Sequence, residues 1–372
     1  MLAQPPLWLI VVAFICAIGP LVFFHELGHF LVGRLFGVGA ETFSIGFGRE
    51  IAGWTDRSGT RWKVGWLPLG GYVRFVGDEH HAGEAETPVE RPRNSFAGKP
   101  VWQRFLIVLA GPMANFLLAI IIFAGFFAAW GIPRTPNAVF AIEPASPAAE
   151  AGLRVGDRIE AVDGQSTPTF EDIQRIVSLR PGEQVTITVK RGERDETLQA
   201  RLGVHLEKDR FGQEYRIGRL GFYATGRQLQ SVPAARLVPE ATRYTWLLTS
   251  TTMEGLWQII TGRRSVDELG GPLKMAQVAG QQASLGLFQF VQLLALFSIN
   301  LGFINLLPVP VLDGGHLLFY AVEAVRRRPV SVQAQEWAFR GGLALLLALL
   351  LFTTVNDLGS FGVWQQLERL IG

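Results

Sequence analysis

Charged side chains and cysteine are both scarce in this chain of 372 residues. Only 18% of the residues are Asp, Glu, Lys or Arg, whereas a typical soluble domain has about 25%. The single cysteine, Cys16, excludes a disulfide framework and any metal cluster built from cysteines. The net charge is +2 and no Lys/Arg stripe is interleaved with aromatics, so no nucleic acid is predicted as a partner. With 49% hydrophobic residues, the composition indicates a membrane protein.

Four long apolar runs supply this hydrophobic excess. No charged residue lies between Pro5 and Phe24, and we expect that segment to be helical through Leu35. About 20 apolar residues span a bilayer. A signal peptide is the alternative for this first run, but no basic stretch precedes it and no small-residue cleavage site follows. The fold class predicted is a polytopic α-helical membrane protein with four transmembrane helices, the later runs being residues 105–133, 285–312 and 341–356.

The positions of Lys and Arg predict how these helices are oriented. Residues 34–104, between the first two runs, hold ten Lys or Arg, and residues 326–340 hold four more. Basic loops stay on the cytoplasmic side of a membrane, whereas long segments cross largely regardless of their charge. Both termini and residues 134–284 are therefore predicted to lie on the opposite, periplasmic side.

Residues 137–205 have the pattern of a small soluble β-rich domain. Val185, Ile187 and Val189 alternate with polar residues, which is typical of a half-buried strand. Ser146 before Pro147 predicts the start of a short helix, and Thr169 before two acidic residues predicts the start of a second. We therefore expect an inserted β-rich domain with two helices.

An HExxH sequence lies on the first predicted span. His25 and His29 are four residues apart, so they share one helix face and can bind one metal ion. Glu26 beside them can take a proton from water activated by that ion. A chance match has a probability of roughly half a per cent in a chain with so few histidines. Ionisable groups on an apolar helix normally mark a function, so we predict a metal site here.

Asp313 is the candidate for a third ligand, which a catalytic zinc site requires. It is the only carboxylate near the end of the third apolar run, and it follows Pro308 and Pro310, which must break the helix. The alternative is that Asp313 only caps the next helix. In the predicted orientation, HExxH and Asp313 both lie toward the cytoplasmic ends of their spans, so they can meet.

Three motifs resemble those of the site-2 protease family. They are HELGH in the first run, GKPVWQRFLIVLAGPMANF in the second and NLLPVPVLDGG in the third. The segment SPAAEAGLRVGDRIEAVDGQ between the second and third runs resembles a PDZ domain. This order, together with ELGGPLKMAQ before the third run, resembles the bacterial regulator-of-sigma-E protease branch. The best-known members of that branch have two tandem PDZ domains, whereas a single one is recognisable here.

The resemblance implies roles for several residues. His25, His29 and Asp313 would ligate Zn²⁺, and Glu26 would be the general base and then the general acid. Asn305 lies in the part of the third motif that holds the substrate backbone. A hydrogen bond between helices is the alternative role for Asn305.

A β-hairpin is predicted between the first two spans, from strands at residues 51–55 and 60–66. Gly70 and Gly71 follow, within an apolar alternating segment. An edge strand near the metal could pair with an unwound substrate segment, and in the family this region is a β-element that dips into the membrane. Gly70 and Gly71 are therefore predicted to contact substrate, with a plain structural turn as the alternative.

These features divide the chain into four parts: residues 1–136 with the first two spans, 137–205 as the PDZ-like domain, 206–284 as an extension, and 285–372 with the last two spans. Within the extension, residues 241–260 could be an amphipathic helix on the outer membrane surface or a fifth span. The sequence does not predict an oligomeric state.

The function implied is intramembrane proteolysis that depends on Zn²⁺, in the inner membrane of a bacterium. The substrates would be single-span membrane proteins already trimmed by another protease, for example an anti-sigma factor. The PDZ-like domain would bind an extended peptide or chain end and exclude untrimmed substrates. Two alternatives remain open at this point: an HExxH protease working at the membrane surface, and a PDZ-bearing scaffold without catalysis.

Overall fold

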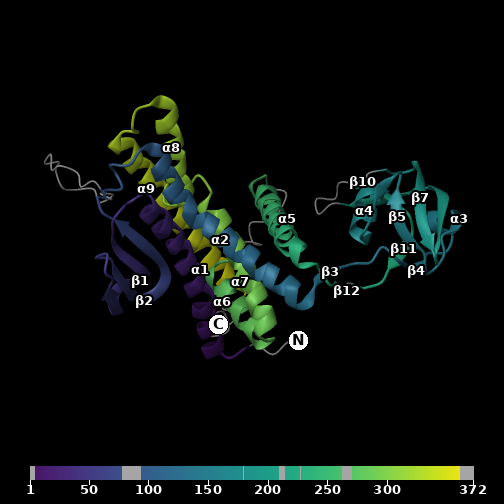
Figure 1. Cartoon of the computed structure of the whole chain (residues 1–372), viewed down its shortest axis with the longest axis horizontal. Coiled ribbons are helices and arrows are strands. Elements are labelled where there is room, and N and C mark those ends of the chain that lie inside the picture. Colours follow the sequence, from purple (N-terminus) through teal and green to yellow (C-terminus); the bar gives the residue numbers. More distant parts are fainter. Residues whose placement is uncertain are drawn as a thin grey trace, which may run out of the picture. The chain divides into compact units, whose positions relative to one another are not determined.

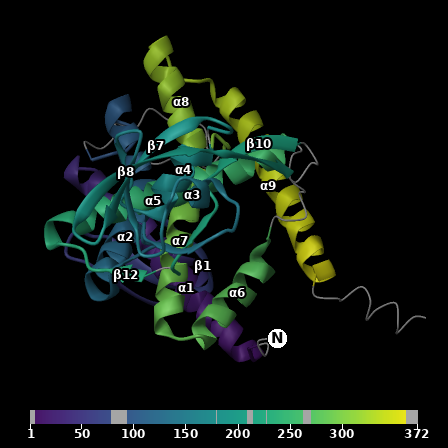
Figure 2. The same cartoon turned by 90° about the vertical axis from the view of Figure 1, so that its right-hand side faces the viewer.

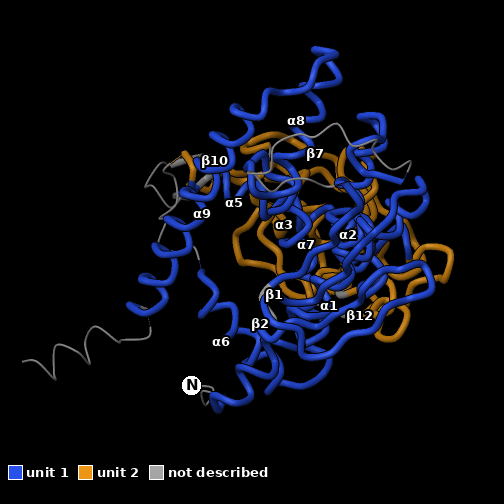
Figure 3. The backbone as a smooth tube through the Cα atoms, turned by 90° about the vertical axis from the view of Figure 1, so that its left-hand side faces the viewer, with its two compact units in different colours: residues 1–123, 238–259, 265–372 blue, residues 124–237, 260–264 orange. Residues whose placement is uncertain are grey.

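The computed structural model describes residues 5–77, 94–178, 180–208, 214–226, 228–261 and 270–360. The chain forms two compact units, which have different colours in Figure 3. One comprises Met1–Phe123, Val238–Ile259 and Ser265–Gly372, and the other comprises Ala124–Leu237 and Ile260–Arg264. The first unit is mainly helical and the second is mainly β-structure (Figure 1).

The helical unit contains long apolar helices and one β-hairpin. Its elements are α1 (Leu7–Leu35), β1 (Ala40–Thr55), β2 (Arg61–Phe75), α2 (Val101–Trp130), α5 (Ala234–Ile260), α6 (Pro272–Ser284), α7 (Leu287–Asn305), α8 (Asp313–Arg326) and α9 (Val332–Ser360). In the described part of the chain, α1, α2, α7 and α9 are long and apolar enough to cross a membrane. The number of such candidate helices agrees with the four predicted spans. Helix α9 begins before the predicted run at residue 341. Helix α5, which contains residues 241–260, is not among these four candidate helices. Trp246 and Trp257 on α5 are exposed.

Small residues let the helices of this unit approach closely. Helix α6 packs against α1, α7 and α9, and Figure 2 shows α6 beside α1 and α7. A Cβ atom added at Gly280 of α6 would lie 2.7 Å from Ile10 Cγ1 of α1. Ala13 and Ala17 of α1 and Ala279 of α6 are buried together in one hydrophobic cluster. Such small residues are typical of helix interfaces in membranes, where backbones must come near one another to gain packing energy.

The two long strands between α1 and α2 form one curled sheet. Residues 42–45 of β1 pair with residues 61–64 on one side and with residues 71–74 on the other. Residues 52–55 extend the sheet beyond residues 61–64. Residues 71–74 consequently form an edge, and no other described strand pairs with their outer side. The hairpin predicted from the sequence is confirmed, and its strands continue further than expected.

The turn of this hairpin is fixed by Asp56. Its carboxylate accepts hydrogen bonds from the Ser58 hydroxyl at 2.6 Å and the Trp62 indole at 2.9 Å. Backbone N–H groups of Ser58 and Thr60 also donate to it. These hydrogen bonds hold the pKa of Asp56 below its usual value. The ionised carboxylate therefore stabilises the turn.

The second unit is built from short strands and two helices. Its elements are β3 (Ile132–Arg134), β4 (Val139–Ile142), α3 (Pro147–Glu150), β5 (Arg158–Val162), β6 (Gln165–Ser166), α4 (Phe170–Ser178), β7 (Gln184–Arg191), β8 (Arg194–Arg201), β9 (Gly203–Lys208), β10 (Glu214–Arg219), β11 (Phe222–Ala224) and β12 (Gln228–Gln230). Four strands form a sheet in the order β6-β5-β7-β8. The predicted alternation is confirmed, because Val185, Ile187 and Val189 are all buried in the core of this unit.

The predicted helix starts are also present. Ser146 Oγ accepts a hydrogen bond from the Ala149 backbone N–H, and Thr169 Oγ1 accepts one from the Asp172 N–H, both at 3.3 Å. Strands beyond residue 205 belong to the same unit, because β10 pairs with β9, β11 with β4 and β12 with β3. The β-rich unit therefore continues past its predicted end, to Gln230.

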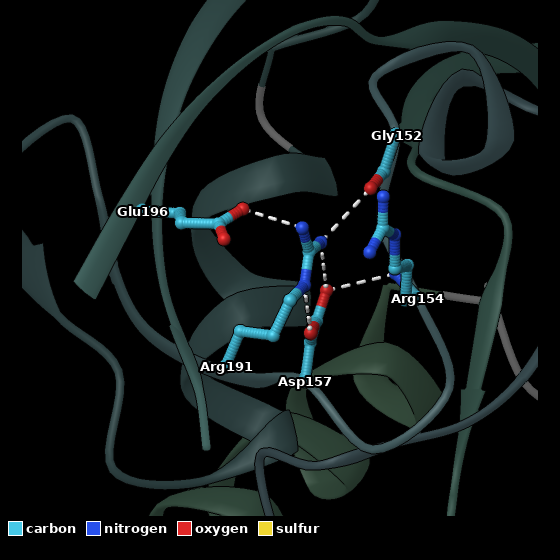
Figure 4. Close-up of polar contacts among 5 residues, drawn as sticks. All are labelled: Gly152, Arg154, Asp157, Arg191 and Glu196. Carbon is cyan, nitrogen blue, oxygen red and sulfur yellow. Dashed lines mark hydrogen bonds and ion pairs between the residues drawn. The ribbon is translucent and has the colours of Figure 1, made fainter. Parts of the chain in front are cut away.

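A buried ion pair connects β7 to the loop before β5 (Figure 4). The Asp157 side chain is 1% exposed, and the Arg191 guanidinium donates two hydrogen bonds of 2.8 Å to it. Arg191 also donates to the Gly152 carbonyl and to Glu196. Burial raises the pKa of Asp157. The hydrogen bonds from Arg191 and from the Arg154 backbone N–H, together with the positive charges of both arginines, outweigh burial and hold this pKa below its usual value.

Replacing Asp157 by Ala is expected to destabilise the β-rich unit by about 2 kcal/mol, because it removes charge-assisted hydrogen bonds. The folded-state pKa of Asp157 is depressed, so its contribution is complete above the unfolded value of about 3.9 and is lost as the pH falls below it. Amide hydrogen exchange of β7 against pH measures both effects. The exposed Asp195, replaced by Ala, is the control; equal protection of β7 in both variants would contradict the prediction.

Candidate active site

The structure places His25, His29 and Asp313 side by side. The two imidazole rings lie one turn apart on α1, with 3.3 Å between their Nε2 atoms. Asp313 Oδ2 is 3.1 Å from His25 Nε2 and 3.5 Å from His29 Nε2. The donor atoms all lie within 4.8 Å of one another. Three residues from two sequence-distant segments, α1 and the start of α8, thus form one candidate ligand set for a metal ion.

A break between α7 and α8 places Asp313. Helix α7 ends at Asn305, two prolines follow in the loop, and α8 starts at Asp313 itself. A Cβ atom at Gly314 would lie 2.2 Å from the Leu307 carbonyl oxygen, and one at Gly315 would lie 2.4 Å from that of Val309. Only residues without a side chain fit there, so the two glycines allow α8 to begin against the proline-containing loop.

Helix α2 supports both imidazoles. His29 Nδ1 lies 2.9 Å from the carbonyl oxygen of Ile107, to which it can donate. One turn on, a Cβ atom at Gly111 would lie 2.2 Å from His29 Nε2. A further turn on, the Asn115 amide lies 3.1 Å from His25 Nδ1. None of these three residues is among those predicted for the site from the sequence, although Gly111 and Asn115 belong to the GPMAN part of the second motif.

The edge strand of the sheet lies against α1 at Glu26. The Glu26 side chain is buried, and its carboxylate interacts with the backbone of Val73 on the edge strand. A Cβ atom at Gly71 would lie 2.7 Å from Val22 Cγ1 and 3.1 Å from Glu26 Cγ. Gly71 therefore allows the strand to lie directly on the helix, beside the carboxylate.

A cavity of about 500 Å³ joins these groups. Asn305 is among the residues that line it, with its Nδ2 atom 3.5 Å from His25 Nε2. His316 and Tyr320 of α8 line it as well. All seven residues predicted for the site from the sequence line this cavity: His25, Glu26, His29, Gly70, Gly71, Asn305 and Asp313.

The donor set fits Zn²⁺. Two imidazole nitrogens and one carboxylate oxygen are ligands that catalytic zinc sites use, with a further position left for water or substrate. Asp313 Oδ2 is buried, and the Nε2 atoms of His25 and His29 face it. Burial of a carboxylate oxygen is costly unless a cation offsets its charge. A zinc ion among these three side chains would supply that charge.

Comparison with known proteins identifies the family. The model of peptidase family M50 matches residues 13–349, and these residues make up most of the chain. The chain belongs to peptidase family M50. The matched residues include HExxH and Asp313, together with the helices that carry them.

Curated relatives of this M50 protein extend over nearly its whole length. The Agrobacterium fabrum protein named "Putative zinc metalloprotease Atu1380" is 42% identical over 361 residues, covering 94% of this chain and 96% of the relative. Metalloprotease MmpA of Caulobacter vibrioides is 36% identical over 386 residues, covering 96% and 97%. The M50 protein is accordingly a zinc metalloprotease of the membrane.

A solved PDZ domain, that of the SdrC-like protein of Listeria monocytogenes, aligns with 24% of this M50 chain and 85% of its own length, at 22% identity and a TM-score of 0.19. Because this TM-score is low, the description of the β-rich unit rests on its own strand pairing and not on this likeness.

Proposed function

We propose that this M50 protein cleaves the transmembrane segments of single-span membrane proteins in a bacterial inner membrane. The observation that carries the proposal is the position of the ligand set. His25, His29 and Asp313 meet at one cavity between helices, two of which, α1 and α7, are apolar enough to cross a bilayer. A hydrolytic site in this place reaches peptide bonds that soluble proteases do not.

In this proposal His25, His29 and Asp313 hold the zinc ion. When bound, zinc supplies Lewis acidity toward water and toward the scissile carbonyl. Glu26 takes the proton from the attacking water and passes it to the leaving amine. Glu26 lines the cavity beside Val73 of the edge strand. Asn305 can donate from its amide to the charge that develops on the carbonyl oxygen.

The edge formed by residues 71–74 is the proposed binding place for the unwound substrate. A transmembrane helix hides its peptide bonds in its own hydrogen bonds, so it must be extended before cleavage. An extended segment can add to a free strand edge through main-chain hydrogen bonds. Gly70 and Gly71 line the cavity at this edge, which places such a segment beside Glu26.

The proposal is tested by mixing the purified full-length protein in detergent with a panel of single-span proteins and soluble peptides. Mass spectrometry then maps the products with and without a chelator. Cleavage within or at the border of the apolar segments, lost with the chelator and restored by zinc, is the expected result. Equal cleavage of the soluble peptides would instead indicate a protease that works at the membrane surface.

Replacing Asp313 by Ala is expected to remove most of the zinc. The variant has only two of three protein ligands, so metal content should fall from about one ion per chain to a small fraction of that. Metal analysis of purified protein measures the change, and the exposed Asp195 replaced by Ala serves as the matched control. Unchanged zinc in the Asp313 variant would remove this residue from the proposed ligand set.

The proposal further assigns the β-rich unit as a PDZ domain on the periplasmic side, with both termini on that side and the zinc site toward the cytoplasm. There it would bind an extended peptide or chain end and exclude untrimmed substrates, such as an anti-sigma factor before its first cut. Ile132 and Gln230 pair with each other, so residues 132–230 can be replaced by a short linker.

The deletion of residues 132–230 is expected to permit cleavage of an untrimmed substrate that the full-length protein leaves intact. A trimmed substrate is the control, and its cleavage should be unaffected. If the untrimmed substrate stays uncut while the trimmed one is still cleaved, the unit does not act as a filter.

A further inference from the structure

Asn115 is a fully buried polar residue that takes no part in the proposed proton transfers. Its side chain is 0% exposed on α2, between apolar helices. Its backbone carbonyl accepts a hydrogen bond of 2.8 Å from Ser298 Oγ of α7, which holds this turn of α2 against α7. Its side-chain amide points at His25, with 3.1 Å between Nδ2 and the Nδ1 atom of the imidazole. Burying an amide costs free energy unless the amide is hydrogen-bonded. The side chain that the Asn115 amide faces is that of His25.

We propose that Asn115 is a positioning residue for the metal site. Its side-chain oxygen accepts the Nδ1–H of His25 and holds that imidazole in the tautomer whose Nε2 lone pair faces the metal. The inference rests on the proposed ligand set of His25, His29 and Asp313, and it adds a residue that touches neither metal nor substrate.

The geometry identifies the nitrogen of His25 that binds metal. Nε2 is the atom that faces Asp313 Oδ2 at 3.1 Å and His29 Nε2 at 3.3 Å. A neutral imidazole has one N–H, so a lone pair on Nε2 requires the hydrogen on Nδ1. The orientation and basicity of a metal-binding histidine depend on an acceptor for that hydrogen. Among the described residues, the Asn115 side chain lies within reach of it.

His29 has the corresponding arrangement. Its Nδ1 lies 2.9 Å from the carbonyl oxygen of Ile107, which can only accept. Ile107 and Asn115 are eight residues apart on α2 and therefore lie two turns apart on one face. One helix face would thus supply an acceptor to each imidazole, from a backbone carbonyl in one case and a side chain in the other.

The amide of Asn115 also has an atom that needs a partner. Its Oδ1 is buried without a hydrogen-bond partner among the residues described. A half-turn of the amide exchanges Oδ1 and Nδ2 and changes little else, since the two atoms are nearly the same size. In that orientation Oδ1 receives the Nδ1–H of His25, which is the bond that metal binding through Nε2 requires.

The experiment measures the zinc dissociation constant of the full-length protein in detergent by competition with a chelator. Asn115→Asp keeps an acceptor in the same place, and we expect its dissociation constant to stay within about threefold of the wild type. Asn115→Leu has a similar volume and no acceptor, and we expect zinc to bind about 10–100-fold more weakly. The visible absorption of the cobalt-substituted proteins should show a changed ligand geometry for Leu and an unchanged one for Asp.

Two results would overturn the inference. One is zinc binding by Asn115→Leu equal to wild type, and the other is equal weakening by the Asp and Leu substitutions. His25→Ala separates this question from the ligand set, because unchanged zinc affinity in that variant would refute the ligand set itself. Should the Leu variant not fold, ¹⁵N NMR of labelled histidine in the zinc-loaded wild type decides: a hydrogen on Nδ1 of His25 supports the inference, and one on Nε2 overturns it.

Discussion

Replacing Glu26 by Gln is expected to lower kcat for peptide hydrolysis by about 10³–10⁴-fold, which is the upper range for loss of a general acid–base group. The amide of Gln has the same shape as the carboxylate, so we expect it to occupy the same place beside Val73. It cannot take a proton from water. Zinc content should remain at about one ion per chain, because Glu26 is not among the proposed ligands. Cleavage of a single-span substrate and metal analysis measure the two quantities.

The exposed Glu160 of β5, replaced by Gln, is the control for this experiment. Glu160 is not among the residues that line the cavity, so the same change of charge there should leave kcat unaltered. If Glu26→Gln kept more than about a tenth of the activity with full zinc content, another residue would have to be the base. If it lost its zinc, the loss of activity would report on metal binding instead.

The sequence predicts the parts of the site that depend on residue type. Imidazoles at positions 25 and 29 share a helix face because of their spacing, whatever the rest of the fold. Asp313 is recognisable because a carboxylate after two prolines is unusual in an apolar run. The four predicted spans follow from length and hydropathy, and four helices of that kind lie in the described part of the chain.

The contribution of α2 could not be predicted in this way. Ile107 acts through a backbone carbonyl, which every residue has, so its side chain carries no signal. Gly111 acts through the absence of a side chain, and glycine is common in the chain, with 42 copies. Asn115 lies 90 positions from His25, so their contact follows from how α1 and α2 pack. Only coordinates place these groups beside the two histidines.

The strand pairing of the curled sheet could not be predicted from the sequence either. Alternation in the sequence predicts a strand but not how many partners it has. Residues 42–45 pair on both edges, with residues 61–64 and with residues 71–74. That double pairing makes residues 71–74 an edge strand next to Glu26. The proposed substrate-binding edge therefore depends on a register that only the folded chain defines.

Adding one methyl group at Gly111 is expected to disable the metal site. A Cβ atom there would lie 2.2 Å from His29 Nε2, well inside van der Waals contact, and that nitrogen is a proposed zinc ligand. The ring cannot simply move away, because its Nδ1 is held at 2.9 Å from the Ile107 carbonyl. We expect Gly111→Ala to weaken zinc binding by about 100-fold or more, at least as much as loss of a supporting hydrogen bond. Chelator competition and cleavage assays should show parallel losses.

Gly125 on the same helix provides the matched control, because a Cβ atom added there meets nothing within 4 Å. Gly125→Ala makes the same chemical change and favours the helix slightly, so zinc affinity and kcat should stay at wild-type values. The two alanine variants then differ only in what the new methyl group touches. Wild-type zinc affinity in Gly111→Ala would mean that the ring of His29 has room to move, and its close packing against α2 would not determine the geometry of the ligand set.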